Sequence, residues 1–206
     1  MPAADLLTLA AGRLTASVAP HAGGSLASFI ADGQVMMRQA PDAHSTDPLT
    51  MACYPLLPFV GRVAFGHFTF EGREVRLPPH PISTPHALHG IGWQRTWEVA
   101  ETTAAQVRLT LAHRPDPASW PWGFDAEQVF TLDETSLTIR IAITNRAGAP
   151  MPCGVGLHPF FPDRLSARMK GELPMIWESG ADGLPTNRTE VTAVRNFTKG
   201  RRIAPL

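Results

Sequence analysis

The segment Leu137-Thr-Ile-Arg-Ile-Ala-Ile-Thr144 decides the fold class. Its four large apolar residues alternate with Thr138, Arg140 and other small or polar residues, so that an extended strand would have one apolar and one polar face. This is the pattern of a half-buried antiparallel strand. The same alternation occurs in Gln106-Val-Arg-Leu-Thr-Leu-Ala-His113. Weaker versions predict further strands at 13–19, 24–31, 64–70, 94–101 and 124–132.

Turn sequences separate these segments. Ala31-Asp-Gly33 and Phe70-Glu-Gly72 predict hairpin tips, and Leu132-Asp-Glu-Thr135 predicts another tight connection. The 20 prolines and 17 glycines of the chain disfavour long helices. The Pro-rich stretch 77–85 has too few backbone donors for a central strand and is expected to be an irregular loop. Many short strands without a helical period indicate a sandwich or a barrel.

Composition narrows the class of protein. The chain has 206 residues, of which 44% are hydrophobic and 17% charged, which suits one domain with a sizeable core. Its 18 basic and 18 acidic side chains give no net field, so we expect no nucleic-acid and no membrane partner. Asp5 and Arg13 interrupt the N-terminal apolar run, which argues against a signal peptide. Two cysteines are too few for a disulfide framework, and a cytoplasmic location is expected.

Three clusters carry the residues that could do chemistry. They are Pro55-Leu-Leu-Pro-Phe-Val-Gly-Arg-Val-Ala-Phe-Gly66, His86-Ala-Leu-His-Gly-Ile-Gly-Trp93 and Gly154-Val-Gly-Leu-His-Pro-Phe-Phe161. Each places a hydrogen-bonding side chain beside Gly or Pro and close to aromatic residues. A sugar site needs this mixture, because hydroxyl groups require directional partners and the C–H faces of the sugar ring require flat apolar surfaces.

In order and content the three clusters resemble the aldose 1-epimerase family. Its members typically carry a Pro-x-x-Asn-Arg-Ile/Val segment, then His-Gly followed by an aromatic, then Gly-x-His-Pro-Tyr/Phe-Phe. The resemblance extends to Gly23-Gly24 and Ser28 near the N-terminus and to the Asp182-Gly-Leu-Pro-Thr186 turn, and so spans nearly the whole chain. It implies an all-β fold, the antiparallel β-sandwich known as a galactose mutarotase-like supersandwich, with little helix and one domain over residues 1–206.

The resemblance also implies roles for the matching residues. His158 corresponds to the catalytic general acid, which donates a proton to the ring oxygen of a free aldose, and Arg62 and His89 correspond to residues that bind the sugar. His86, Trp93 and Phe160 complete the predicted substrate-binding set. Opening a hemiacetal needs an acid at the ring oxygen and a base at the anomeric hydroxyl, and histidine titrates near neutrality. The expected partner is a small-molecule sugar, with no cofactor.

The sequence departs from the family pattern in two places. Gly61 stands where the family has Asn, which removes one hydrogen-bonding partner. The family's catalytic base is a glutamate near the C-terminus, preceded by a sugar-binding aspartate, and both motifs fall after Leu206. Glu172, Glu178 and Glu190 do not sit in the matching motif. The chain is therefore expected to be C-terminally incomplete relative to the family, with unpaired strand edges that favour a homo-oligomer.

Three functions stay open at this point. The first is a carbohydrate mutarotase or epimerase that acts at the anomeric carbon, the second is a non-catalytic sugar-binding module, and the third is a truncated, inactive family member. The spacing His86-x-x-His89, with His158 as a third ligand, also allows a zinc site. Residues three apart on a strand point to opposite faces, however, so we expect no metal. Trp120 and Trp122 suit a cap on the sandwich as well as a sugar-stacking surface.

Overall fold

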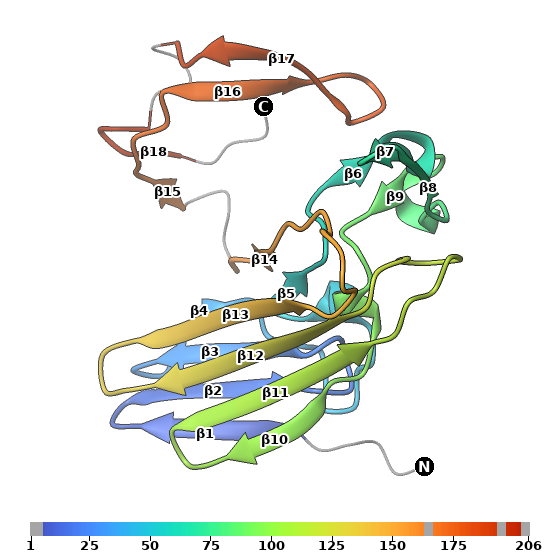
Figure 1. The fold of residues 1–206 in the computed structure, drawn as a ribbon. Helices are drawn as coiled ribbons and strands as arrows, with labels where there is room; N and C mark the ends of the chain where they lie inside the picture. The colour runs from blue at the N-terminus through green and yellow to red at the C-terminus, as the bar shows by residue number, and fades with distance from the viewer. Residues whose placement is uncertain (1–5, 163–166, 193–196, 203–206) are drawn as a thin grey trace. The chain divides into compact units, whose positions relative to one another are not determined.

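The computed structural model describes residues 6–162, 167–192 and 197–202 (Figure 1). The chain divides into two compact units, Met1–Pro162 and Asp163–Leu206, which we describe separately. The prediction of one domain over residues 1–206 stays a prediction. The described helices are 3-10 helices of three residues each: η1 (Pro48–Thr50), η2 (Ala64–Gly66), η3 (Pro81–Ser83) and η4 (Gly92–Gln94). None of the helices found in the described ranges is long and apolar enough to cross a membrane.

The first unit contains the two main sheets, and their strands are antiparallel. The six-stranded sheet has the order β1-β2-β3-β5-β14, with β4 paired to β3, and the four-stranded sheet has the order β10-β11-β12-β13. The bounds of the first sheet are β1 (Leu7–Ala11), β2 (Leu14–Ala19), β3 (Ser25–Ala31), β4 (Gln34–Met37), β5 (Cys53–Leu56) and β14 (Gly156–Pro159). Those of the second are β10 (Glu98–Thr102), β11 (Gln106–His113), β12 (Phe124–Leu132) and β13 (Leu137–Asn145). The two sheets lie face to face in Figure 1. The predicted antiparallel β-sandwich with little helix is thereby confirmed.

Alternating burial builds the core between the sheets. Along β12 every second residue is buried, from Phe124 to Leu132, and Trp97, Phe124 and Phe130 are at most 1% exposed. Leu9 and Leu26 meet them from the other sheet and are fully buried. Each large apolar side chain removed from water in this way contributes about 1.5–3 kcal/mol to stability. The alternating residues of such a strand are therefore those that face the inside of the sandwich.

The hairpin predictions hold in detail. Asp32 and Gly33 have φ angles of 53° and 74°, and Glu71 and Gly72 have φ angles of 47° and 77°, so both residues of each turn are left-handed. Such tips match the twist of a two-stranded ribbon. The second turn joins β7 (His67–Phe70) to β8 (Arg73–Arg76), which pair with each other outside the main sheets.

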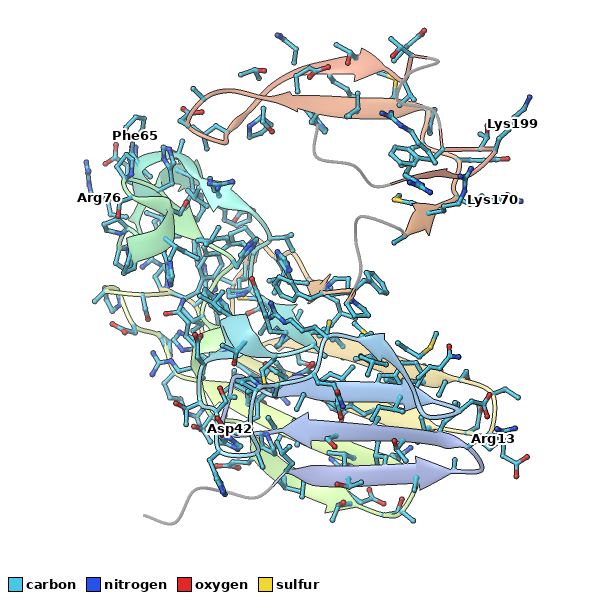
Figure 2. All side chains as sticks on the ribbon, turned by 180° about the vertical axis from the view of Figure 1, so that it is seen from behind. Arg13, Asp42, Phe65, Arg76, Lys170 and Lys199 are labelled. Carbon is cyan, nitrogen blue, oxygen red and sulfur yellow. The ribbon has the colours of Figure 1, made fainter. Side chains whose placement is uncertain are left out.

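Two predicted strands begin later than expected. The segment predicted from residue 64 starts with η2, because Phe65 takes a left-handed φ of 51° that no strand accommodates. The segment predicted from residue 94 begins as a strand only at Glu98, since the chain first completes η4. A short pair, β6 (Arg62–Val63) with β9 (Ala87–Leu88), ties the arginine and histidine clusters together. Figure 2 labels Phe65 in η2, which follows β6, and Arg76 at the end of β8.

The second unit consists of short strand pairs. Strand β15 (Arg168–Met169) pairs with β18 (Arg201–Arg202), and β16 (Met175–Ser179) pairs with β17 (Pro185–Glu190). Asp182 accepts a hydrogen bond from the Leu184 amide in the turn between β16 and β17. Lys170 and Lys199, labelled in Figure 2, belong to this unit. All of the predicted site residues belong to the first unit.

Candidate functional site

Pairing between β5 and β14 places the predicted acid. In this antiparallel pair His158 lies directly opposite Tyr54, and their rings stack with centroids 4.8 Å apart at an interplanar angle of 16°. Tyr54 is 3% exposed, so the imidazole rests on a fixed and buried surface.

Further rings gather around this pair. Phe160 stacks on His158 with centroids 4.6 Å apart, and Trp93 stacks on Tyr54 at 5.1 Å. His89 meets His158 edge-on at 5.7 Å. We call these five residues, Tyr54, His89, Trp93, His158 and Phe160, the ring cluster. Four of them were predicted site residues, and the structure brings those four together from parts of the sequence that lie far apart.

The tight turn after β9 positions His89. Its φ is 57°, a conformation that few non-glycine residues adopt, and two bonds with Gly61 hold it there. The His89 amide donates to the Gly61 carbonyl at 2.9 Å, and the Gly61 amide donates to His89 Nδ1 at 3.0 Å. Gly90 follows with a φ of 72°, and a Cβ on it would collide with the carbonyl oxygen of Leu57. Only glycine fits at that position.

Those contacts fix the protonation of His89. Because Nδ1 accepts a hydrogen bond, the proton of the neutral ring sits on Nε2. Burial lowers the pKa of His89 to about 4, with smaller contributions from His158, Arg62 and His80. Near neutral pH the ring is therefore an uncharged donor in a fixed orientation, which suits a sugar oxygen.

His158 sits in a related environment. Burial lowers its pKa, and the charge of Arg38 lowers it further. Its Nδ1 is buried and has no hydrogen-bond partner among the described residues. Next to it, burial raises the pKa of the Cys53 thiol to about 12, so this thiol stays protonated at neutral pH. Cys53 and Cys153 are both free, as the sequence predicted.

Arg62 reaches the cluster from the side of His89. Its Nε donates to Ser83 Oγ at 3.0 Å, and Ser83 is only 7% exposed. The Pro-rich loop thus orients the guanidinium, whose charge contributes to the low pKa of His89. His89 consequently lies near both His158 and Arg62.

His86 takes a different position from the other predicted binding residues. It is 2% exposed, its Nδ1 accepts from the Phe65 amide at 3.0 Å, and its ring lies edge-on to Phe65 at 5.3 Å. These contacts hold the strained η2 turn beside Arg62. A direct role in substrate binding stays a prediction for His86, whose Nε2 is buried and lacks a hydrogen-bond partner within the described residues.

Trp93 and Phe160 form walls of the cluster. Trp93 is 2% exposed and its indole N–H donates to the Gly90 carbonyl at 3.2 Å, so that only its ring is available for packing. Phe160 is half-buried. Trp120 and Trp122 lie elsewhere in the main core, where they pack on each other at 5.2 Å. This favours the first of the two interpretations of that pair, the cap on the sandwich.

Sequence reasoning missed two residues of the site. Tyr54 is the single tyrosine of the chain and directly precedes the Pro55 cluster, but only the β5–β14 register shows that it faces His158. Arg38 follows β4, and its guanidinium carbon lies 3.8 Å from the centroid of the Phe160 ring. No motif in the sequence marks Arg38, because its partners come from distant segments.

A cavity of about 430 Å³ borders the turn that contains Gly90. Its walls include His80, Leu88 and Gly90, and His80 packs on Trp93 at 5.0 Å. His158, His89 and Arg62 are not among its lining residues. The prediction that these three residues face one cavity therefore stays a prediction.

The arrangement combines an imidazole near a fixed neutral donor, a cation and several flat rings. Such a set can hold a polyol through directional hydrogen bonds and packing, and can move a proton at an oxygen. Comparison with known proteins shows the family. Residues 5–205 match the family model described as aldose 1-epimerase, and the chain belongs to this family.

Individual relatives extend the comparison. The chain is 30% identical over 172 residues to the uncharacterized protein YphB of Escherichia coli K12, covering 84% of this chain and 57% of that protein. It is 29% identical over 204 residues to the uncharacterized protein YihR of the same organism, covering 96% of this chain and 65% of that one. A crystal structure of a putative aldose 1-epimerase from E. coli K12 superposes with a TM-score of 0.88 at 27% identity, covering 97% of this chain and 66% of that chain. The chain thus spans less than two thirds of the length of these relatives.

Proposed function

We propose that the ring cluster binds a free aldose and that His158 transfers a proton to and from the sugar's ring oxygen, so that the two anomers interconvert. The observation that carries this proposal is the stacking of His158 on Tyr54 and Phe160 with His89 5.7 Å away. The imidazoles supply polar edges for the sugar hydroxyls, and the packed aromatic rings hold these imidazoles in place. Membership of the aldose 1-epimerase family supports the same reaction class.

The proposed step balances without a cofactor. A proton passes from His158 to the ring oxygen as the bond from that oxygen to C1 breaks. A base, for which water can serve, takes the proton of the anomeric hydroxyl, and the C1 carbonyl forms. Rotation about the C1–C2 bond and the reverse transfers then close the ring on the other face. General acid and general base each typically contribute about 10²- to 10⁴-fold to such a reaction.

The other site residues have separate roles in binding the sugar. His89 offers its Nε2 proton to a sugar oxygen, since its Nδ1 is already bonded to the Gly61 amide. Arg62, oriented by Ser83, contributes a second donor group and a positive charge close to developing negative charge. Trp93, which is 2% exposed, supports Tyr54 and His89 by packing against their rings. Binding in this scheme depends on hydrogen bonds and packing, and the net charge of zero predicts weak binding with little dependence on salt.

Exchange spectroscopy tests the proposal. The rate of anomer exchange of galactose and glucose is measured by NMR with wild-type protein, with His158→Gln and with His44→Gln, an exposed loop histidine, as the matched control. Acceleration that H158Q abolishes and H44Q retains supports the proposal. Binding of the sugar without acceleration would reassign the site to a sugar-binding module. Acceleration that H158Q and H44Q leave equally intact would show that His158 is not the proton donor.

A further inference from the structure

Arg38 is tied to the ring cluster by both its backbone and its side chain. Its amide donates to the Phe160 carbonyl at 2.8 Å, and its guanidinium carbon lies 3.8 Å from the centroid of the same residue's ring. Phe160 in turn stacks on His158 at 4.6 Å and 27°. Arg38 therefore fixes the residue that covers one face of the imidazole.

Backbone carbonyl groups hold the guanidinium in place. Arg38 Nε donates to the Met51 carbonyl at 3.0 Å, and Nη2 donates to the carbonyls of Leu49 and Met51. These acceptors belong to η1 and the segment leading into β5, the strand that carries Tyr54. One side chain thus connects the two strands that place Tyr54 and His158.

Within the part of the chain that the structure describes, Arg38 makes no ion pair with a carboxylate, although Asp47 lies within electrostatic reach of it. The ion pairs found among the described residues do not include it, and the neighbours that orient it are neutral carbonyls. A cation bound by carbonyl groups keeps its full effect on nearby titrating groups. The site consequently contains a permanent positive charge on the side of Phe160.

We infer that Arg38 is a positioning residue for His158: its guanidinium holds Phe160 against the imidazole and places a fixed positive charge beside that ring. The inference rests on the proposed function only in taking His158 as the working group. A neighbouring cation makes protonated His158 a stronger acid, because the charged form is disfavoured there. The lowered pKa of His158, to which Arg38 contributes after burial, agrees with this assignment.

Other groups near His158 do not substitute for Arg38. Tyr54 and Cys53 on β5 both have raised pKa values because of burial, so both are neutral near pH 7. His89 is neutral above about pH 4. Asp47 lies within electrostatic reach of Tyr54 and Arg38. Arg38 is the permanent cation that contributes to the shift of the His158 pKa.

The test is an NMR titration of the His158 imidazole without any sugar, so that its outcome does not depend on the proposed reaction. The variants are Arg38→Met, which removes the charge, and Arg38→Lys, which keeps it. Arg73→Met is the matched control, since Arg73 lies over the Trp122 ring at 5.1 Å and away from the cluster.

The expected result is an upward shift of the His158 midpoint in R38M, and a midpoint close to wild type in R38K and R73M. In R38K the contacts between the Phe160 and His158 rings weaken, because lysine cannot bridge Leu49 and Met51 as the guanidinium does. High salt also raises the midpoint in wild-type protein, which tests the charge even if R38M fails to fold. A midpoint that responds neither to R38M nor to salt overturns the inference, and so does an equal response to R73M.

Discussion

His158 and Tyr54 face each other across the β5–β14 pair, with ring centroids 4.8 Å apart and planes within 16° of parallel. Backbone pairing sets this contact, and packing against Trp93 and Phe160 then restricts both rings. The acid predicted from the sequence is therefore held by the sheet itself, in the way that a precisely oriented proton donor requires.

Removing the Tyr54 ring is expected to loosen His158 and destabilise the protein. Tyr54→Leu should cost about 2 kcal/mol in the free energy of unfolding, because the site is fully buried and cannot refill the lost volume. Tyr54→Phe should keep the stack and cost less. Urea denaturation gives the stability, and calorimetry with galactose gives the affinity. Equal sugar affinity in Y54L and wild type would contradict a role for this ring in the site.

Gly90 is expected to be indispensable for the turn that carries His89. Gly90→Ala drives a Cβ into the Leu57 carbonyl oxygen in addition to straining a φ of 72°. Its expected cost is about 3 kcal/mol or more.

Gly33 provides the matched control. Its φ of 74° is almost the same, but a Cβ there meets no atom within 4 Å. Gly33→Ala should cost only about 1 kcal/mol, from the backbone conformation alone. Thermal unfolding of the two variants separates strain from collision. If both lose the same stability, the close approach of Gly90 to Leu57 is not what requires glycine.

His89 makes stability depend on pH with a definite sign. Its pKa in the folded protein is lowered to about 4 from an ordinary value of 6.5, so the unfolded chain binds a proton that the folded one does not. The stabilisation is fully present above about pH 6.5 and is lost as the pH falls toward 4. The loss should be on the order of 2 kcal/mol. Urea denaturation at a series of pH values measures it, and His89→Gln should flatten the curve. A curve that H89Q does not change would remove His89 as its cause.

Gly61 can be replaced by the residue that the family carries. Its φ is 80°, and a Cβ added there would have no atom within 4 Å, so Gly61→Asn should fold with a change of less than about 1 kcal/mol. Asparagine tolerates this backbone region and adds a hydrogen-bonding group beside His89. We expect sugar affinity to rise in G61N, measured by calorimetry, with Gly61→Ala as the control that adds bulk without a polar group. Equal affinities in the two variants would show that this position does not reach the ligand.

Much of the fold could be predicted because apolar and polar residues alternate along several of its long strands. Strands β11 and β13 were predicted nearly to the residue, since in each one face is more buried than the other and no proline interrupts the strand. Strand β5 lacks that signal. All four of its residues are buried and one is Pro55, so neither alternation nor hydrogen-bonding capacity marks it as a strand.

The site could be predicted only in part for a related reason. His158, His89 and Arg62 stand in recognisable motifs, so a single sequence reveals them. Tyr54 and Arg38 act through contacts that depend on strand register and on packing between distant segments, and neither has a local pattern. His86 stands in a motif as well, but burial beneath Phe65 gives it a supporting place that the motif does not show.

The most direct test of the account follows the histidine imidazole signals by NMR while galactose or glucose is added. The account predicts that His158 and His89 shift together with one saturating midpoint, at low and high salt alike. The rings of His67 and His113, which lie outside the ring cluster, should not move. If the sugar leaves His158 and His89 unchanged, or shifts all four histidines alike, the ring cluster is not a sugar site.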